Sequence, residues 1–270
     1  MRVPLPPSLA DSAAARSASP VAPRDAATIA LVRPGSSGPQ TYLLRRQSSM
    51  AFAAGQYVFP GGAVQESDAD DIGWVGPDAD TWGRRLGCEP TMARSLVVAA
   101  VRETFEESGI LLAGPDEHAV ASDVSQPWAQ DARLALESGA LSLADLLAER
   151  GLVLRADLVS AWAHWITPAF EPRRYDTRFF VAVAPEGQRV GSLPGEADRA
   201  QWVGLADAVR AVEDGAAAML PPTLVTCREL AAVDLAHLHA TAAERTIEPI
   251  EPRLVEVDGE LFLENPIEET

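Results

Sequence analysis

The sequence contains no lysine, so all 22 basic side chains among its 270 residues are arginines. They are outnumbered by 39 aspartate and glutamate residues, which gives a formal net charge of −17. This balance argues against binding to nucleic acid or to an anionic membrane through bulk charge. An anionic substrate would have to be met by locally placed arginines or by a metal ion.

Cysteine is also scarce, and no long apolar run is present. Cys88 and Cys227 fit no metal-binding or redox spacing, which predicts two unpaired thiols. No apolar run reaches the length of a membrane span. Residues 1–25 are rich in Ala, Ser and Pro and lack the apolar segment of a signal peptide. We expect them to form a flexible N-terminal arm of a cytoplasmic protein.

What the chain does have is a cluster of carboxylates within residues 102–110. Glu103, Glu106 and Glu107 stand at i, i+3 and i+4, so on a helix they share one face. Such a cluster in isolation is more often a solvated acidic face. Here Gly109 follows at the position of a helix C-terminal glycine, and a Gly61-Gly62 turn lies upstream. Because Mg²⁺ is held by carboxylates together with substrate phosphates, the pattern predicts half of a metal–phosphate site.

Together, Phe59-Pro60-Gly61-Gly62 and residues 102–110 resemble the Nudix box, G-x5-E-x7-R-E-U-x-E-E-x-G-U, in which U is aliphatic. Its second half is matched by Arg102, Glu103, Glu106, Glu107, Gly109 and Ile110, whereas Thr104 replaces an aliphatic residue. Asp68 occupies the position of the first Glu. Residues 69–101, which are 33 residues, then separate Asp68 from Arg102 where the family has seven. The box is therefore split by an insertion.

A split box resembles the peroxisomal coenzyme A diphosphatase-like branch of the family. The resemblance spans roughly residues 25–240, through Leu43–Arg46, Gly55–Gly62, Trp165–Pro168, Arg173–Phe180 and Leu220–Thr223. Bacterial coenzyme A pyrophosphatases carry a Leu-Arg pair and a His before the box. Here those positions hold Met50, Ala51 and Ala53. This departure keeps ADP-ribose, a dinucleotide or another nucleotide sugar open as the substrate.

The resemblance also implies roles for individual residues. Glu106 and Glu107 are the firmest metal ligands, Glu103 is a ligand or the base, and Arg102 orients a carboxylate. Gly61 and Gly62 bring backbone close to the phosphates or the metal, with Gly62 placed at the metal. A further carboxylate often joins the site in this family, and Glu196 is the candidate, with a solvated loop residue as the alternative. We expect Asp68 to be structural.

Arginines and aromatic residues outside the box are candidates for substrate contacts. A guanidinium can bind phosphate as a two-pronged fork. The candidates are Arg46, Arg173, Arg174 and Arg178, and the alternative for each is an ion pair in an acidic protein. Trp165, Phe170 and Tyr175 could stack on adenine, or belong to the core. His164 lies on an apolar strand and is expected to be a core histidine rather than a base.

Hydrophobic periodicity predicts a mixed sheet flanked by helices, in agreement with the α/β/α sandwich that the Nudix resemblance implies. We expect one Nudix domain over residues 26–270, with insertions at about 69–90 and 114–153. The first insertion is expected to be a surface loop, and the second to carry helices near 129–137 and 142–150. The other expected helices are 90–108, 205–213 and 221–244. Strands are expected at 26–32, 41–45, 56–59, 158–166, 178–183 and 200–203, with a hairpin at 255–263.

These features predict a Mg²⁺- or Mn²⁺-dependent hydrolase that cleaves the pyrophosphate bond of a nucleoside diphosphate derivative. Coenzyme A or an acyl derivative is the leading substrate. One alternative is a nucleotide-sensing module without catalysis, although the three intact glutamates argue against it. Another is a scaffold role through the insertions. Homodimers are frequent in the family, and nothing in this sequence shows one.

Overall fold

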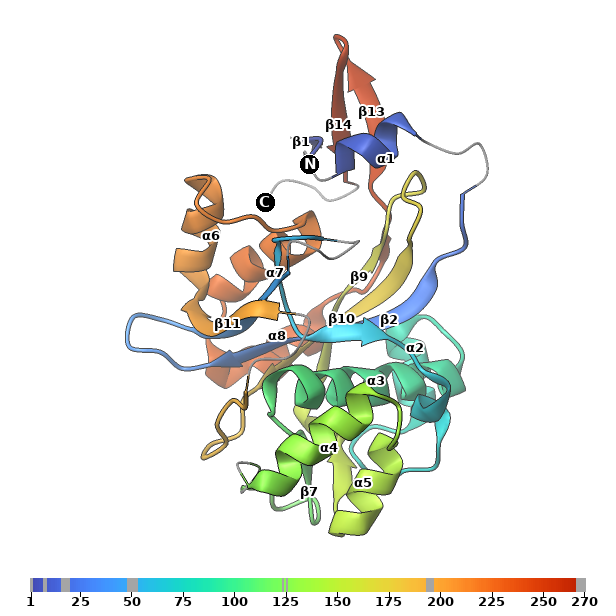
Figure 1. Ribbon diagram of the computed structural model, residues 1–270, viewed down its shortest axis with the longest axis vertical. Coiled ribbons are helices and arrows are strands. Elements are labelled where there is room, and N and C mark those ends of the chain that lie inside the picture. The colour runs from blue at the N-terminus through green and yellow to red at the C-terminus, as the bar shows by residue number, and fades with distance from the viewer. Residues whose placement is uncertain are drawn as a thin grey trace.

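A mixed β-sheet of eight strands forms the centre of the molecule (Figure 1). The computed structural model describes residues 2–6, 9–15, 20–47, 53–122, 124, 126–192 and 197–265. The strands follow the order β11 (Ala197–Gly204), β3 (Gln40–Arg46), β2 (Arg24–Arg33), β10 (Tyr175–Val183), β9 (Ser160–Ile166) and β12 (Pro249–Ile250). Two short strands complete it: β4 (Tyr57–Val58) pairs with β3, and β5 (Gly61–Ala63) pairs with β2.

The middle of the sheet is a parallel pair, β2 with β10, while β9 lies antiparallel to β10. Seven consecutive residues of β2 are buried, because helices cover both faces of the sheet at this point. The sequence there, Ala-Ala-Thr-Ile-Ala-Leu-Val, is accordingly apolar on both sides of the strand. The predicted strands at 26–32, 41–45, 158–166, 178–183 and 200–203 are all confirmed. β9 begins at Ser160, two residues later than expected, and β4 is shorter than the expected 56–59.

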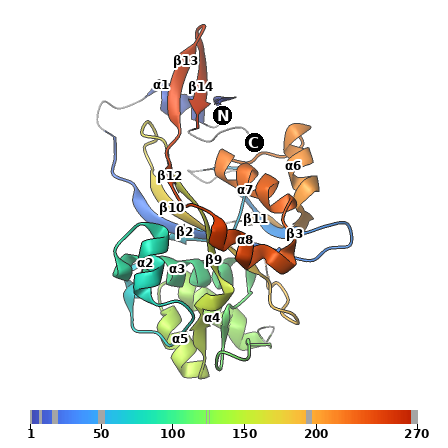
Figure 2. The ribbon, with the colours of Figure 1, turned by 180° about the vertical axis from the view of Figure 1, so that it is seen from behind.

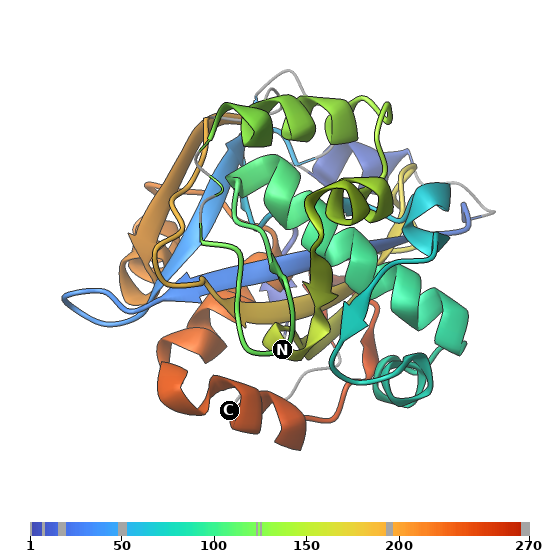
Figure 3. The same ribbon diagram turned by 90° about the horizontal axis from the view of Figure 1, so that it is seen from below.

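Helices pack on both faces of this sheet, as the view from below shows (Figure 3). One face is covered by α3 (Pro90–Ser108), behind which lie α2 (Ala79–Leu86), α4 (Pro127–Glu137) and α5 (Leu143–Arg150). The other face is covered by α6 (Leu205–Glu213), α7 (Pro221–Ala231) and α8 (Leu238–Glu244) (Figure 2). Each face has its own hydrophobic core. The three layers confirm the predicted α/β/α sandwich.

Helix α3 runs between the residues that the sequence predicts. Pro90 stands at its first turn, where its missing N–H costs nothing. Gly109 ends it in the left-handed conformation at φ 78°, and the Gly109 N–H donates to the carbonyl of Phe105. Thr104 is fully buried, and its hydroxyl donates to the carbonyl of Ala100. A threonine therefore fits a position that is usually aliphatic.

The first insertion is not the surface loop that we expect from its Asp- and Gly-rich sequence. It follows directly after η2 (Glu66–Ala69) and contains β6 (Trp74–Val75) and α2. Asp78 caps α2 by accepting from the Thr81 N–H, and Gly87 ends it at φ 65°. Trp82 is 4% exposed and meets Phe180 of the central sheet edge to face, with ring centroids 5.8 Å apart. The insertion thus contributes to the core.

The second insertion carries two helices, as predicted, in α4 and α5. A small sheet in the order β6, β8 (Val153–Arg155), β7 (Ala113–Gly114) joins it to the first insertion, and η3 (Ala156–Leu158) leads on to β9. The two insertions therefore contact each other through this small sheet.

The C-terminal helix is shorter than predicted. A single helix over 221–244 is wrong, because the chain breaks after α7 into η4 (Leu235–His237) and α8. Asp234 marks the break, since its carboxylate accepts from the Ala236 N–H and starts a new turn. The predicted hairpin is confirmed in β13 (Arg253–Val257) and β14 (Glu260–Glu264). Its turn has Asp258 at φ 53° and Gly259 at φ 83°, as a type I′ turn requires.

The N-terminal arm has regular structure within its described residues. β1 (Arg2–Pro4) pairs antiparallel with β14, and the short helix α1 (Ala10–Ala14) follows. Both lie beside the C-terminal hairpin at one end of the molecule (Figures 1 and 2). Cys88 and Cys227 are unpaired, as predicted. In the described part of the chain, no helix has the length and apolarity needed to cross a membrane.

Replacing Trp82 tests whether the first insertion belongs to the core. We expect W82A to lower the free energy of unfolding by about 3–5 kcal/mol, because it leaves a large cavity between α2 and the sheet. W74A is the control, since Trp74 is only partly buried. W74A should lower the free energy of unfolding clearly less than W82A does. Urea denaturation followed by circular dichroism measures both values. Equal, small effects of both substitutions would show that the insertion packs independently of the core.

Candidate active site

The predicted carboxylates face a cavity of about 550 Å³. Glu103, Glu106 and Glu107 from α3 line one wall, and the Gly61-Gly62 turn lies beside them. The cavity also meets Arg46 at the end of β3. Apolar and aromatic residues supply much of the remaining wall, among them Val58, Phe59, Trp165, Ile166, Pro168, Tyr175, Phe179, Leu220, Pro221 and Pro222. The three glutamates and the two glycines of the box therefore line one cavity, whose remaining surface is largely apolar.

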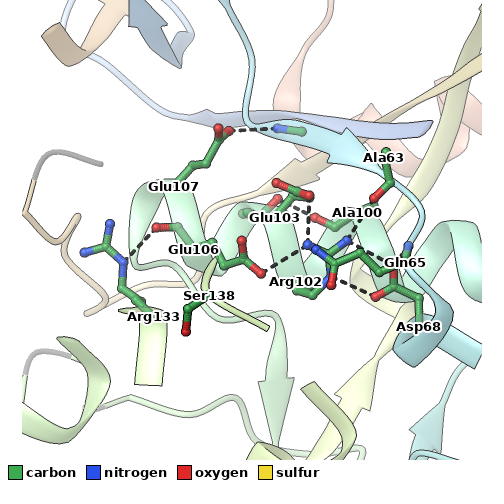
Figure 4. Close-up of polar contacts among 12 residues, drawn as sticks. Ala63, Gln65, Asp68, Ala100, Arg102, Glu103, Glu106, Glu107, Arg133 and Ser138 are labelled. Carbon is green, nitrogen blue, oxygen red and sulfur yellow. Dashed lines mark hydrogen bonds and ion pairs between the residues drawn. The ribbon is translucent and has the colours of Figure 1, made fainter. Parts of the chain in front are cut away.

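Arg102 holds the carboxylates in place from beneath (Figure 4). Its side chain is 1% exposed, and it donates five hydrogen bonds. Two go to Asp68, at 2.8 and 3.0 Å, and one goes to the carbonyl of Ala63 at 3.1 Å. The other two reach Glu103 Oε1 at 2.8 Å and Glu106 Oε1 at 3.1 Å. Arg102 does not line the cavity, so its geometry fits the expected orienting role.

Asp68 is the structural partner that the sequence predicts. Its carboxylate is 1% exposed and takes the two-pronged contact from Arg102, while Oδ2 also accepts from the Gln65 N–H at 2.8 Å. Burial disfavours the charged guanidinium of Arg102. The hydrogen bonds that Arg102 donates to Asp68, together with the charges of Glu103, Asp68 and Glu106, outweigh this effect and raise the pKa of Arg102. The Arg102–Asp68 ion pair is thus buried, and both of its side chains are shielded from solvent.

The two glycines of the turn are each placed against a carboxylate. The Gly61 N–H donates to Glu107 Oε2 at 2.9 Å, which fixes that side chain against the turn. A Cβ atom added at Gly62 would lie 2.2 Å from Glu103 Oε1, so no larger residue fits there without moving the carboxylate. Thr28 braces the turn from β2 by donating to the Pro60 carbonyl at 2.5 Å.

Glu106 carries negative charge that its surroundings do not fully offset. Burial, followed by the nearby carboxylate of Glu103, raises the pKa of Glu106 to about 7, although Arg102 acts in the opposite direction. Arg133 of α4 reaches the same turn of helix and donates from Nε to the Glu106 carbonyl at 2.9 Å (Figure 4). Its Nη2 donates to the Ser192 carbonyl at 3.0 Å. The second insertion therefore anchors the C-terminal turn of α3.

The donor set suits a hard divalent cation. Such ions take carboxylate oxygens, and a positive charge would offset the repulsion that raises the pKa of Glu106. Among the described residues, no three Asp, Glu, His or Cys side chains form a closed metal-binding group. The three glutamates would have to draw together around an ion, and their shared helix face and rotatable side chains permit this.

The other candidate residues have different locations. Arg46 lines the cavity, and so does Arg173. Arg174 instead donates to the carbonyls of Thr167 and Val21 and to Glu251, and it is 9% exposed. Arg178 is 5% exposed and is bound to Leu86 and Asp176, away from the cavity lining. These two arginines are engaged with internal partners.

Two further predictions concern an aromatic wall and a histidine. Trp165 and Tyr175 both line the cavity, whereas Phe170 does not. His164 is 7% exposed, and its Nε2 lies 2.5 Å from Asp176 Oδ1, as expected of a satisfied core histidine. Glu196, with Met50 and Ala51, lies outside the described residues.

Three cavity or anchor residues are absent from the sequence predictions. Glu171 lines the cavity from the loop after β9, Thr28 supports the glycine turn, and Arg133 binds α3 from an insertion. None belongs to a motif. No local pattern marks them, because their roles arise from contacts between distant segments.

Comparisons with known proteins agree with this geometry. The model of the NUDT19 Nudix domain matches residues 89–230, slightly more than half of the chain. A Caenorhabditis elegans protein that carries the name nudix hydrolase 7 is 26% identical over 83% of this chain and 66% of its own length. The human protein named acyl-coenzyme A diphosphatase NUDT19 is 27% identical over 81% of this chain and 68% of its own length. The chain thus spans about two thirds of each relative.

Among solved structures, a NUDIX hydrolase from Alicyclobacillus acidocaldarius is similar to this chain. It is 28% identical, with a TM-score of 0.66, over 82% of this chain and 96% of its own. The similarity therefore covers most of this chain and nearly all of that protein.

Removing the Arg102 guanidinium tests its role as the anchor. We expect R102M to lower the free energy of unfolding by about 3–5 kcal/mol, because it leaves the buried Asp68 carboxylate without its partner. In the double variant R102M/D68N, the free energy of unfolding should fall by less than the sum of the two single-variant decreases, which urea denaturation can measure. R228M is the matched control, since Arg228 pairs with Glu213 at the surface. Additive losses at positions 102 and 68 would contradict the pairing.

The raised pKa of Glu106 predicts a pH dependence of stability in metal-free buffer. The folded protein protonates Glu106 near pH 7, whereas the unfolded chain does so near 4.5. The folded state therefore binds the extra proton between these values, and stability falls as the pH rises through this window. E106Q removes the charge. We expect the free energy of unfolding of E106Q to exceed that of the wild type by on the order of 3 kcal/mol at pH 8 and to equal it at pH 4.5.

Denaturation in EDTA at several pH values measures this difference. Added Mg²⁺ should narrow the gap at pH 8 by stabilising the wild type more than E106Q. A wild type that is as stable as E106Q at pH 8 without metal would show that the Glu106 charge is already compensated.

Proposed function

Because the chain belongs to the Nudix family, in the branch of the NUDT19 Nudix domain, we propose that it hydrolyses a pyrophosphate bond in a nucleoside diphosphate derivative. The observation that carries this proposal is the placement of Glu103, Glu106 and Glu107 opposite the Gly61-Gly62 turn in one cavity. Phosphoanhydride cleavage needs neutralised phosphates and an activated water, which this arrangement can provide.

Glu103, Glu106 and Glu107 would hold Mg²⁺ or Mn²⁺, with the backbone at Gly62 close by. A bound divalent ion would supply charge neutralisation and a water of lowered pKa. Within the chain, Arg102 keeps Glu103 and Glu106 on the cavity side of α3, and the Gly61 N–H holds Glu107. Arg46, which lines the same cavity, would contact a phosphate of the bound substrate. Glu196 remains the proposed additional carboxylate.

Coenzyme A or an acyl derivative is the proposed substrate. Support comes from the human relative that is named an acyl-coenzyme A diphosphatase and from the apolar and aromatic wall of the cavity. Water would add across the pyrophosphate and release 3′,5′-ADP and the corresponding phosphopantetheine. ADP-ribose, dinucleotides and nucleotide sugars offer the same pyrophosphate to the same carboxylates.

Product formation from coenzyme A, ADP-ribose and NADH, followed by mass spectrometry, tests the proposal. We expect 3′,5′-ADP from coenzyme A when Mg²⁺ or Mn²⁺ is present, and none in EDTA. E107Q should lower the rate at least about 100-fold, because it removes a charged ligand from the site. E149Q, which alters an exposed glutamate on α5, should leave the rate unchanged.

Each other outcome is informative. Turnover of ADP-ribose or NADH alone would keep the hydrolase and discard coenzyme A. Nucleotide binding without turnover of any of the three would point to a sensing module.

A further inference from the structure

The cavity extends along the central strands, well beyond the carboxylates. Thr28 of β2 pairs with Gly61, and on its other side with Phe179 of β10. Tyr175, which also lines the cavity, stands four residues earlier on β10. At about 3.3 Å per residue, this is about 13 Å from the level of the glycine turn. A pyrophosphate at the carboxylates would leave the rest of the substrate near Tyr175.

This distant end is formed by β9 and the loop that joins it to β10. Trp165, Thr167, Pro168 and Glu171 line it. The loop is held against the strand, since the Thr167 N–H donates to the Tyr175 carbonyl and the Glu171 N–H donates to the Pro168 carbonyl. The walls at this end therefore come from a short, internally bonded hairpin.

Two polar atoms at this end have no partner. Trp165 is 3% exposed and Glu171 is 6% exposed, yet Nε1 of the first and Oε1 of the second make no hydrogen bond within the described part of the chain. A buried polar group left without a hydrogen bond destabilises the folded protein, so such groups are normally paired. Trp162, on the same strand, shows the usual outcome, because its Nε1 donates to Glu229 Oε2 at 2.7 Å.

The two atoms are chemically complementary. An indole N–H can only donate, and a carboxylate oxygen can only accept. The other side of the Glu171 carboxyl is occupied, since it bonds to the side chain of Ser12 in α1. Leu9, just before α1, lines the same cavity. One donor and one acceptor without a partner among the described residues thus belong to residues that line a largely apolar pocket, which Leu9 helps to cover.

We propose that this end of the cavity is a binding subsite, in which Trp165 donates to and Glu171 accepts from one planar group of the substrate. The group must carry an N–H donor beside an acceptor, as in an amide or a nucleobase edge. This inference rests on the proposed function and deepens it by naming what the non-phosphate part of the substrate must offer. The adenine base and the amides of a pantetheine arm both meet the requirement.

Binding measurements on the full chain separate these sources without requiring turnover. Isothermal titration calorimetry with adenosine 5′-monophosphate and with pantetheine gives the affinity of each probe. W165F retains a large aromatic ring and removes only the donor, and E171M keeps a similar length without the acceptor. We expect each substitution to weaken one of the two probes about tenfold, the loss of one hydrogen bond in a buried site.

Loss for adenosine 5′-monophosphate alone would assign the subsite to the base, and loss for pantetheine alone would assign it to the amide. W162F is the matched control, because Trp162 lies outside the cavity lining, and it should leave both affinities unchanged. Near-ultraviolet circular dichroism checks that each variant is folded. If W165F does not fold, the probe affinities of E171M alone test the subsite.

The inference is overturned if both affinities are unchanged in the two variants, or if the wild type binds neither probe. Its failure is distinct from failure of the proposed function. Turnover with unaltered probe binding in W165F and E171M would remove only the subsite. Selective loss of a probe in a protein that hydrolyses nothing would remove only the hydrolase.

Discussion

The site depends on one buried cation that is shared among three carboxylates. Arg102 is the point at which α3, β5 and η2 meet, because its five hydrogen bonds reach Ala63, Asp68, Glu103 and Glu106. The buried ion pair between Arg102 and Asp68, with its two hydrogen bonds, fixes the position of the Arg102 guanidinium. The contacts with Glu103 and Glu106 leave those side chains oriented while their negative charge is only partly balanced. A rigid anchor and an unbalanced face are what a cation-binding surface needs.

Local signals in the sequence account for the parts of the structure that depend on neighbouring residues. Pro90 and Gly109 bound α3 correctly, and the i, i+3, i+4 spacing places the glutamates on one face. The Asp258-Gly259 turn likewise defines its hairpin. Contacts over long distances could not be predicted in this way. Asp78 and Gly87 bound α2 locally, but its place against the sheet depends on the contact of Trp82 with Phe180, which is almost a hundred residues away.

The same distinction explains the arginines. Arg46, Arg174 and Arg178 are alike by composition, and each could bind phosphate. What separates them is their location. Arg46 lines the cavity, whereas carbonyls and carboxylates from other segments engage Arg174 and Arg178 before any ligand arrives. Glu171 shows the converse, because an unremarkable loop residue becomes notable only once burial leaves one of its oxygens without a partner.

The pairing of β1 with β14 has a consequence for the order of folding. These strands are separated by nearly the whole chain, and the Leu5 N–H also donates to the Leu261 carbonyl. During synthesis on the ribosome, the first strand must wait for residues 260–264 before it can pair. The sheet and α3 can assemble while that strand is still waiting. The pairing that helps to cover the distant end of the cavity therefore cannot form until residues 260–264 have been synthesised.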